Sequence, residues 1–187
     1  VCLDSQGEVI RPALLWNDTR SAGAAEDLTC ERGDGDRERG ARWWARATGL
    51  VPVASFTVTK LRWVADNEPE NARKIAAICL PHDWLSWKIR GGFEGVGLEG
   101  LCTDRSDASG TGYMDRADAV YRREILAQAL RISMEEAEGI ILPKICEPVE
   151  AMGCGDPRHG WGEIAIGPGC GDNAGAALGV GLGDLQP

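Results

Sequence analysis

The sequence has no apolar run long enough to cross a membrane and no dense cluster of basic residues. Its longest apolar stretches, such as residues 75–80, fall far short of the ~20 residues that span a bilayer. Lys and Arg number 20 against 29 Asp and Glu, so the net charge is −9 at pH 7. Surfaces that bind nucleic acid or anionic membranes are basic, and this composition therefore argues against both kinds of partner.

Paired cysteine motifs are also missing. The seven cysteines are an odd number, are widely scattered and include no Cys-x-x-Cys. Cys146, Cys154 and His159 lie near one another in the sequence, but their spacing matches no zinc-binding pattern. The sequence therefore predicts free thiols in a reducing cytoplasm rather than a disulfide framework or a metal site.

The length of 187 residues allows one full domain or one domain with part of another. Glycine is abundant, with 25 residues, of which seven lie in 91–112 and eleven in 153–183, so two loop-rich regions are expected. Val1 is not a start methionine, and the first residues do not have the pattern of a signal peptide. We interpret the chain as an internal piece of a longer protein.

Predicted strands and helices alternate along the chain, which indicates an α/β fold. Gly7 is expected to turn a hairpin within residues 1–10, and residues 13–16 to form a short buried strand. Further strands are predicted at 75–80 and 164–167. A helix is predicted at 20–30, with N-cap side chains at 17–19. Further helices are predicted at 41–48, 55–66, 70–74, from 82 to about 90, at 118–132 and at 174–180, and a short helix is predicted to begin at the capping box of 133–136.

The turn at residues 169–175, Gly-Cys-Gly-Asp-Asn-Ala-Gly, carries the strongest chemical signal. It presents Asp172 at the carboxyl end of a predicted strand and beside a helix N-terminus, where open α/β sheets place their ligands. The helix N-terminus favours the charged form of this carboxylate. In phosphoryl transfer to an alcohol, a carboxylate has only to position the hydroxyl and accept its proton late. Taken alone, Asp172 could equally be a helix cap without a chemical role.

Five segments, in order along the chain, resemble the FGGY carbohydrate kinases, with xylulokinases the most similar members. These segments are 11–20 (RPALLWNDTR), 55–67 (SFTVTKLRWVADN), 80–85 (LPHDWL), 103–111 (TDRSDASGT) and 169–175 (GCGDNAG). The second fits the family signature, with Lys60 and Trp63 near its centre, and the fifth matches the segment that carries the family's catalytic aspartate. The resemblance covers nearly the whole chain.

The resemblance implies a ribonuclease H-like, actin-type ATPase fold with a mixed sheet flanked by helices, here lacking its first strands. Residues 1–187 would then form part of the sugar-binding lobe, and the ATP-binding lobe would follow. The implied activity of the parent enzyme is ATP-dependent phosphorylation of D-xylulose to D-xylulose 5-phosphate, as in xylose metabolism, with this isolated chain inactive. A kinase of another ketose or polyol, such as ribulose or glycerol, and an inert sugar-binding fragment remain as alternatives.

The resemblance also implies roles for four residues. Asp172 would be the catalytic base, and Asn173, Trp16 and Ser55 would contact the sugar, the indole by packing on its carbon chain. ATP and Mg²⁺ would be held mainly by parts outside this chain, because the sequence has no Walker-type phosphate loop. A sugar, ATP and, because a partial lobe exposes apolar surface, a second copy in a homodimer are the expected partners.

Other polar residues in these segments are expected to be structural. Lys60 is predicted to extend a solvated ammonium from a packed helix. Asp83 is expected to cap a helix, and Asp104 and Asp107 to form turn hydrogen bonds. Neither His82 nor His159 has a nucleophile or metal partner that the sequence reveals, so both are interpreted as bystanders.

Overall fold

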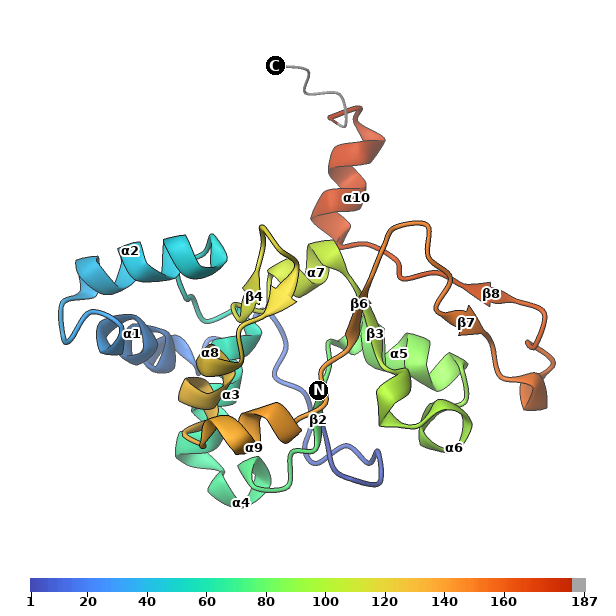
Figure 1. The fold of residues 1–187 in the computed structure, drawn as a ribbon, viewed down its shortest axis with the longest axis horizontal. Coiled ribbons are helices and arrows are strands. Elements are labelled where there is room, and N and C mark those ends of the chain that lie inside the picture. Colours follow the sequence, from blue (N-terminus) through green and yellow to red (C-terminus); the bar gives the residue numbers. More distant parts are fainter. Residues whose placement is uncertain (183–187) are drawn as a thin grey trace.

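In the computed structural model, which describes residues 1–182, short strands run through the middle of the molecule with helices on either side (Figure 1). The helices are α1 Ala22–Glu31, α2 Arg37–Thr48, α3 Thr57–Asn67, α4 Pro69–Ala72, α5 Pro81–Ile89, α6 Gly92–Val96, α7 Arg105–Ser109, α8 Arg123–Leu130, α9 Met134–Gly139 and α10 Asp172–Gly179, with 3₁₀ turns at Leu98–Gly100 and Pro157–His159. The strands are β1 Cys2–Leu3, β2 Ala77–Ile78, β3 Cys102–Asp104, β4 Met114–Asp115, β5 Val120–Tyr121, β6 Lys144–Cys146, β7 Gly153–Cys154 and β8 Ala165–Ile166.

The strands of residues 1–182 form two-stranded pairs rather than one wide mixed sheet. β1 pairs antiparallel with β2, and β3 pairs parallel with β6. The stretch that leads into β6 connects these two pairs, because Ile141 exchanges backbone hydrogen bonds with the β2 region before β6 reaches β3. β4 with β5 and β7 with β8 form antiparallel pairs of their own. The fold is thus α/β, with its strands short and its pairing local.

The helices α1, α2, α3 and α8 enclose the larger hydrophobic core. Trp44 is fully buried there and donates from Nε1 to the carbonyl oxygen of Leu28 at 3.0 Å, so its single polar atom is satisfied. Arg62 is only 1% exposed and bonds Asp66, Glu31 and the carbonyl oxygen of Gln128, which connects α3 to α1 and α8. A buried arginine needs such partners because an unpaired buried charge is costly.

Several predicted boundaries are confirmed. The φ of +76° at Gly7 closes the predicted hairpin, in which Ile10 N donates to the carbonyl oxygen of Cys2. Gly49 ends α2 in the left-handed conformation with φ +75°. At α9, Ser133 and Glu136 form the predicted capping box. Local side-chain chemistry therefore sets these turns and helix ends.

Two predictions near the N-terminus were wrong. Residues 13–16 form no strand, and the side chain of Trp16 is 79% exposed. Helix α1 begins at Ala22 rather than 20, and its N-cap, Ser21, makes no capping bond. Ser21 instead donates to the carbonyl oxygen of Ala54 at 2.9 Å, because this helix start is docked on the loop before α3.

The predicted helix at 118–132 is shorter than its apolar spacing suggested. Ala119, with φ +53°, turns a hairpin in which Tyr121 lies on β5, and α8 occupies only residues 123–130. Tyr121 donates from its hydroxyl to the carbonyl oxygen of Pro143 at 2.9 Å. The periodicity continues beyond the helix because the flanking side chains, Tyr121 and Ile132, pack on the same core.

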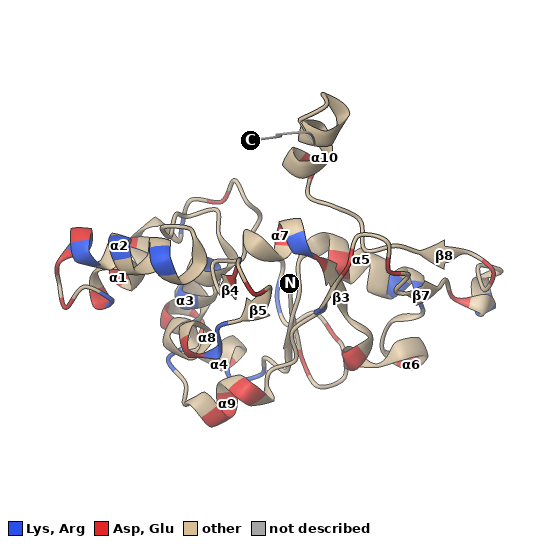
Figure 2. Ribbon diagram, turned by 45° about the horizontal axis from the view of Figure 1, so that its top comes forward, with Lys and Arg blue, Asp and Glu red and all other residues tan. Residues whose placement is uncertain are grey.

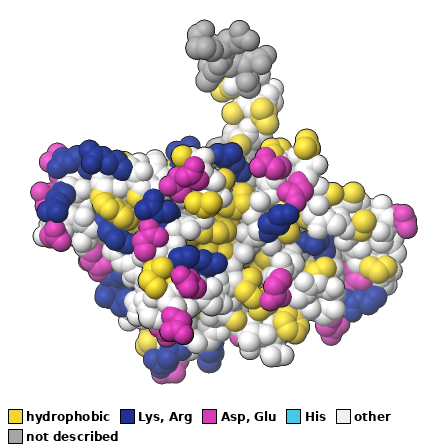
Figure 3. Space-filling view, in the orientation of Figure 1, with side chains coloured by type: hydrophobic (Ala, Val, Ile, Leu, Met, Phe, Trp, Pro, Cys, Tyr) yellow, Lys and Arg dark blue, Asp and Glu magenta, His cyan; other side chains and the backbone are white. Residues whose placement is uncertain are grey.

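Helix α10 projects from the body, with α7 near its base (Figure 1). In the space-filling view it stands clear of the remaining surface and exposes apolar side chains (Figure 3), of which Leu178 and Val180 are examples. Basic and acidic residues are interspersed along α2, whereas the charged residues of α1 are all acidic (Figure 2). Among residues 1–182, no helix combines the length and the apolar character needed to cross a membrane.

Candidate active site

The predicted strand, turn and helix around Asp172 are present. β8 leads into residues 169–171, here named the glycine turn, in which Gly169 has φ +78°, and α10 begins at Asp172. The N-cap residue is Gly171, so Asp172 does not cap the helix. Its carboxylate is exposed and accepts only from the adjacent Asn173 N, at 2.8 Å. The alternative of a purely capping role is therefore not supported by the geometry.

Helix α7 contacts the glycine turn directly. Gly171 N donates to Ser106 Oγ at 2.8 Å, across 65 positions of the sequence. A Cβ added to Gly171 would lie 2.7 Å from Asp107 Oδ1, closer than carbon and oxygen can pack. The backbone at Gly171 thus lies directly against the α7 side chains, and a larger residue there would force one of the two to shift.

Asp172 and Asn173 border an open hollow of about 1010 Å³, which we name the aspartate hollow. Its walls are the glycine turn, α10, α7, β4 with the turn that follows it, and the end of β6. The charged residues in these walls are Asp104, Asp107, Asp172, Arg105 and Arg116. Burial, reinforced by the charge of Asp104, raises the pKa of Asp107, and the charge of Asp172 adds to this effect. The hollow thus gathers negative charge beside the predicted base.

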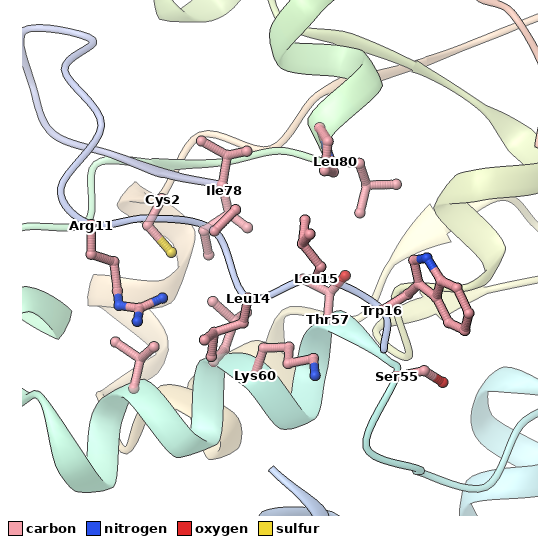
Figure 4. A pocket seen from close by; sticks show the side chains of 15 residues that line it. Cys2, Arg11, Leu14, Leu15, Trp16, Ser55, Thr57, Lys60, Ile78 and Leu80 are labelled. Atoms are coloured by element: carbon pink, nitrogen blue, oxygen red, sulfur yellow. The ribbon is translucent and has the colours of Figure 1, made fainter. Parts of the chain in front are cut away.

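Trp16 and Ser55 border a different cavity, of about 200 Å³, which we name the tryptophan pocket (Figure 4). Ser55 and the indole of Trp16 lie at one end and Arg11 at the other. The remaining lining is mainly apolar and includes Leu14, Leu15, Leu61, Val64 and Ile78. The structure therefore brings together the four predicted site residues as two pairs, one in each cavity.

Lys60 corrects one prediction about this pocket. Its side chain is buried rather than solvated, and its Nζ donates to the carbonyl oxygen of Asp18. Burial lowers the pKa of Lys60, and the nearby Asp18 opposes that shift. Since Asp18 directly follows the segment that carries Trp16, Lys60 anchors that segment on α3. Its role in the described structure is to shape the pocket wall.

His82 corrects a second prediction, because it is surrounded by carboxylates. Its Nε2 lies 2.9 Å from Asp83 Oδ1 and 3.2 Å from Asp104 Oδ2, and its Nδ1 lies 3.3 Å from Asp107 Oδ2. We name these four residues the histidine cluster. The facing carboxylates of Asp104 and then Asp83 raise the pKa of His82 to about 10. His82 is therefore a cation at neutral pH and not a bystander.

The structure confirms part of what was predicted for the aspartates. Asp83 Oδ2 accepts from Leu80 N at 2.7 Å, as a residue capping the start of α5 should. Asp104 is the N-cap of α7 and accepts from the backbone N of Ser106 and Asp107. For Asp104, burial alone would raise the pKa, but bonds from His82 and Ser106 bring it below its usual range. Asp107, however, faces His82 rather than closing a turn.

The histidine cluster is also the closest grouping of metal-ligand types among residues 1–182, with ligand atoms of His82, Asp104 and Asp107 within 4.8 Å of one another. The two ring nitrogens face different carboxylates, Nε2 toward Asp104 and Nδ1 toward Asp107, so the cluster offers a mixed nitrogen and oxygen set. Mg²⁺ prefers oxygen ligands in octahedral geometry. These residues therefore do not fit Mg²⁺.

Sequence comparison places this site in a known class. The model of the N-terminal domain of the FGGY family of carbohydrate kinases matches residues 1–179. The chain belongs to the FGGY family.

Among individual relatives, the xylulose kinase of Streptomyces coelicolor is 45% identical over 186 residues, which cover 97% of this chain and 34% of that protein. The xylulose kinase of Streptomyces rubiginosus is 42% identical with the same coverage. The crystal structure of xylulose kinase from Bifidobacterium adolescentis superposes with a TM-score of 0.89 at 47% identity, covering 97% of this chain and 41% of that one. This chain thus spans about a third of the length of these curated relatives.

The sequence analysis missed the functional grouping of His82 with Ser106, Asp104 and Asp107. A signal was present, since His82 comes four residues after the end of β2 and Asp104 is the last residue of β3. Both strands bond to the same stretch, 141–146, so their carboxyl ends lie at the same edge of the fold. Polar residues after neighbouring parallel strands are expected to meet there.

Proposed function

We propose that this chain forms the sugar-binding part of an ATP-dependent xylulose kinase, whose product is D-xylulose 5-phosphate. The observation that carries the proposal is Asp172, exposed at the strand-to-helix turn and bordering the aspartate hollow. The chain that presents it is 45% and 42% identical to two xylulose kinases over 97% of its length. Asp172 takes the proton of the accepting hydroxyl while that oxygen bonds to the γ-phosphorus and the bond to the ADP oxygen breaks.

Asn173, Trp16 and Ser55 are the proposed sugar contacts. Asn173 stands beside Asp172 on the first turn of α10 and offers both a donor and an acceptor to the hydroxyls of the sugar. The exposed indole of Trp16 offers a flat apolar face to the C–H groups of the sugar, and Ser55 lies at the same end of its pocket. Binding of a ketose across both pairs would bring its hydroxyl to Asp172.

ATP is the proposed phosphoryl donor, with Mg²⁺ as its counter-ion, and we assign no contact to either within residues 1–182. The histidine cluster does not fit Mg²⁺, and the sequence offers no Walker-type loop. We therefore expect the 187-residue chain alone to be inactive and the complete gene product to be active. All seven cysteines are free, which supports a reducing cytoplasm as the location.

The test is a substrate panel. The complete gene product is assayed with MgATP and D-xylulose, D-ribulose or glycerol, and the 187-residue chain is assayed in parallel. We expect the highest kcat/KM with D-xylulose and turnover only in the complete protein. A higher kcat/KM with another acceptor would refute the substrate, and no turnover with any acceptor by a folded protein would refute the kinase activity.

A further inference from the structure

His82 lies between carboxylates that no Lys or Arg of residues 1–182 neutralises. Asp83 and Asp104 are almost fully buried, and each has an oxygen, Oδ1 and Oδ2 respectively, that faces only the imidazole. Asp107 faces the opposite ring nitrogen. A neutral imidazole has one N–H, whereas the imidazolium has two and can serve both edges of the ring. The geometry therefore calls for a protonated His82 that binds α5 to the start of α7.

An ion-pair contact followed by hydrogen bonds connects this cation to the glycine turn. Asp104 presents Oδ2 to His82, while its Oδ1 accepts from the backbone N and from the hydroxyl of Ser106. Because the Ser106 hydroxyl donates to Asp104, its oxygen is free to accept from Gly171 N, as it does at 2.8 Å. Gly171 is the residue directly before Asp172.

A second contact couples the same elements. Asp107 faces His82 through Oδ2, and its Oδ1 lies 2.7 Å from the position that a Cβ on Gly171 would take. Without the cation, three carboxylates on α5 and α7 would repel one another, and Asp172 on α10 also acts on Asp107 electrostatically. The position of α7 against α5, and hence of the glycine turn against α7, thus depends on the charge at His82.

We propose that His82 is a positioning residue for Asp172, acting through Asp104 and Ser106 on the backbone of Gly171. The proposal rests on the proposed function, because it assumes that Asp172 acts as the base. It assigns His82 no contact with the sugar or with ATP. Its loss should therefore impair the chemical step more than substrate binding.

The experiment is a double-mutant cycle in the complete gene product with His82→Gln, Ser106→Ala and the combined variant. Each single change should lower kcat about tenfold while the KM for ketose and for ATP stays within about threefold, as expected when only the reacting geometry is lost. The combined variant should be little worse than either single one, because both changes break one path. His82→Lys, which keeps a cation, should recover part of kcat. His159→Gln is the matched control, since that histidine faces Asp156 outside the site.

Hydrogen exchange adds a readout that does not depend on activity. The peptide covering residues 169–175 should exchange faster in His82→Gln and Ser106→Ala than in the wild type, and unchanged in His159→Gln. If His82→Gln fails to fold, Ser106→Ala, which removes one hydroxyl, still tests the last step of the path.

Three results would overturn the proposal. The first is that the losses of kcat in His82→Gln and Ser106→Ala multiply in the combined variant. The second is that His82→Gln has wild-type kcat while Asp172→Asn is inactive, which would leave the proposed function intact. The third is a stoichiometric metal ion, found by elemental analysis of the wild type and lost from His82→Gln. Full activity of Asp172→Asn would instead refute the role of Asp172 in the proposed function.

Discussion

The tryptophan pocket and the aspartate hollow differ in volume and in the charged residues that line them. The pocket is small and mainly apolar, and its two cations are already engaged, Arg11 by Glu68 and Lys60 by the carbonyl oxygen of Asp18. The hollow is about five times larger, is lined by three aspartates and two arginines, and has its predicted base beside a turn whose backbone donates to Ser106. Apolar walls suit the carbon chain of a ligand, whereas a precisely held carboxylate suits proton transfer.

This contrast suggests that binding and chemistry are divided between the two regions. Helix α5 lies between them, because Leu80 and Pro81 line the pocket while His82 contacts two aspartates of the hollow. Substitutions in the pocket should then change mainly KM, and substitutions in the hollow mainly kcat. The predictions below test that division in the complete gene product.

The largest effect is expected for Asp172→Asn. The amide keeps the size of the side chain but cannot accept the proton, so kcat should fall by at least about 10²-fold with KM for the ketose nearly unchanged. Steady-state kinetics with D-xylulose and MgATP measure both constants. A kcat within about tenfold of the wild type would show that Asp172 is not the base.

Gly171→Ala should have the next largest effect. The added Cβ would approach Asp107 Oδ1 to 2.7 Å, so either the Asp107 carboxylate or the glycine turn must shift, and either shift disturbs the contacts beside Asp172. We expect kcat to fall about tenfold or more, since small displacements of reacting groups are costly.

Gly167→Ala is the matched control. Gly167 lies on the same segment, and a Cβ added there would have no atom within 4 Å. Kinetics and a thermal melt of both variants separate local displacement from unfolding. Equal kcat in the two variants would contradict the close contact between the glycine turn and α7.

Trp16→Ala tests the other region. Loss of the exposed indole should raise KM for the ketose about tenfold, equivalent to ~1.4 kcal/mol, and leave kcat within about twofold. Trp161→Ala is the control, since Trp161 is also partly exposed but stacks on His159 away from both cavities. A fall in kcat without a change in KM would show that Trp16 acts in the chemical step, which contradicts the assignment of the pocket to substrate binding.

Short sequence patterns predicted much of the fold. They failed where contacts between residues far apart in the sequence determine the backbone conformation. The end of α2 at Gly49 and the capping box of α9 were predictable because they depend on residues within one turn. Residues 13–16 have the apolar character of a strand, yet their backbone finds no strand partner and instead lines a pocket that Lys60 helps to fix. No local pattern reveals such a role.

The candidate site shows the same limit. Asp172 could be predicted because its turn has its own sequence signature beside a helix N-terminus. The histidine cluster could not be assembled in the same way, since its residues come from 82–83 and from 104–107 and meet only through the strands that precede them. The burial of Lys60 likewise depends on a carbonyl oxygen 42 positions away.

The smallest expected effect is on the pH dependence of folding stability. It tests the charge of His82, which lies between the two regions. The pKa of His82 is raised from 6.5 to about 10, so its folded-state stabilisation is fully present below pH 6.5 and is lost as the pH rises through about 10. The lowered pKa of Asp104 concerns acidic pH and does not contribute in this window. The difference in Tm between wild type and His82→Gln should therefore be largest near pH 6 and shrink toward pH 10, whereas His159→Gln should follow the wild type. A Tm difference between wild type and His82→Gln that stays constant over this pH range would show that the imidazole stabilises the fold by packing and not by its charge.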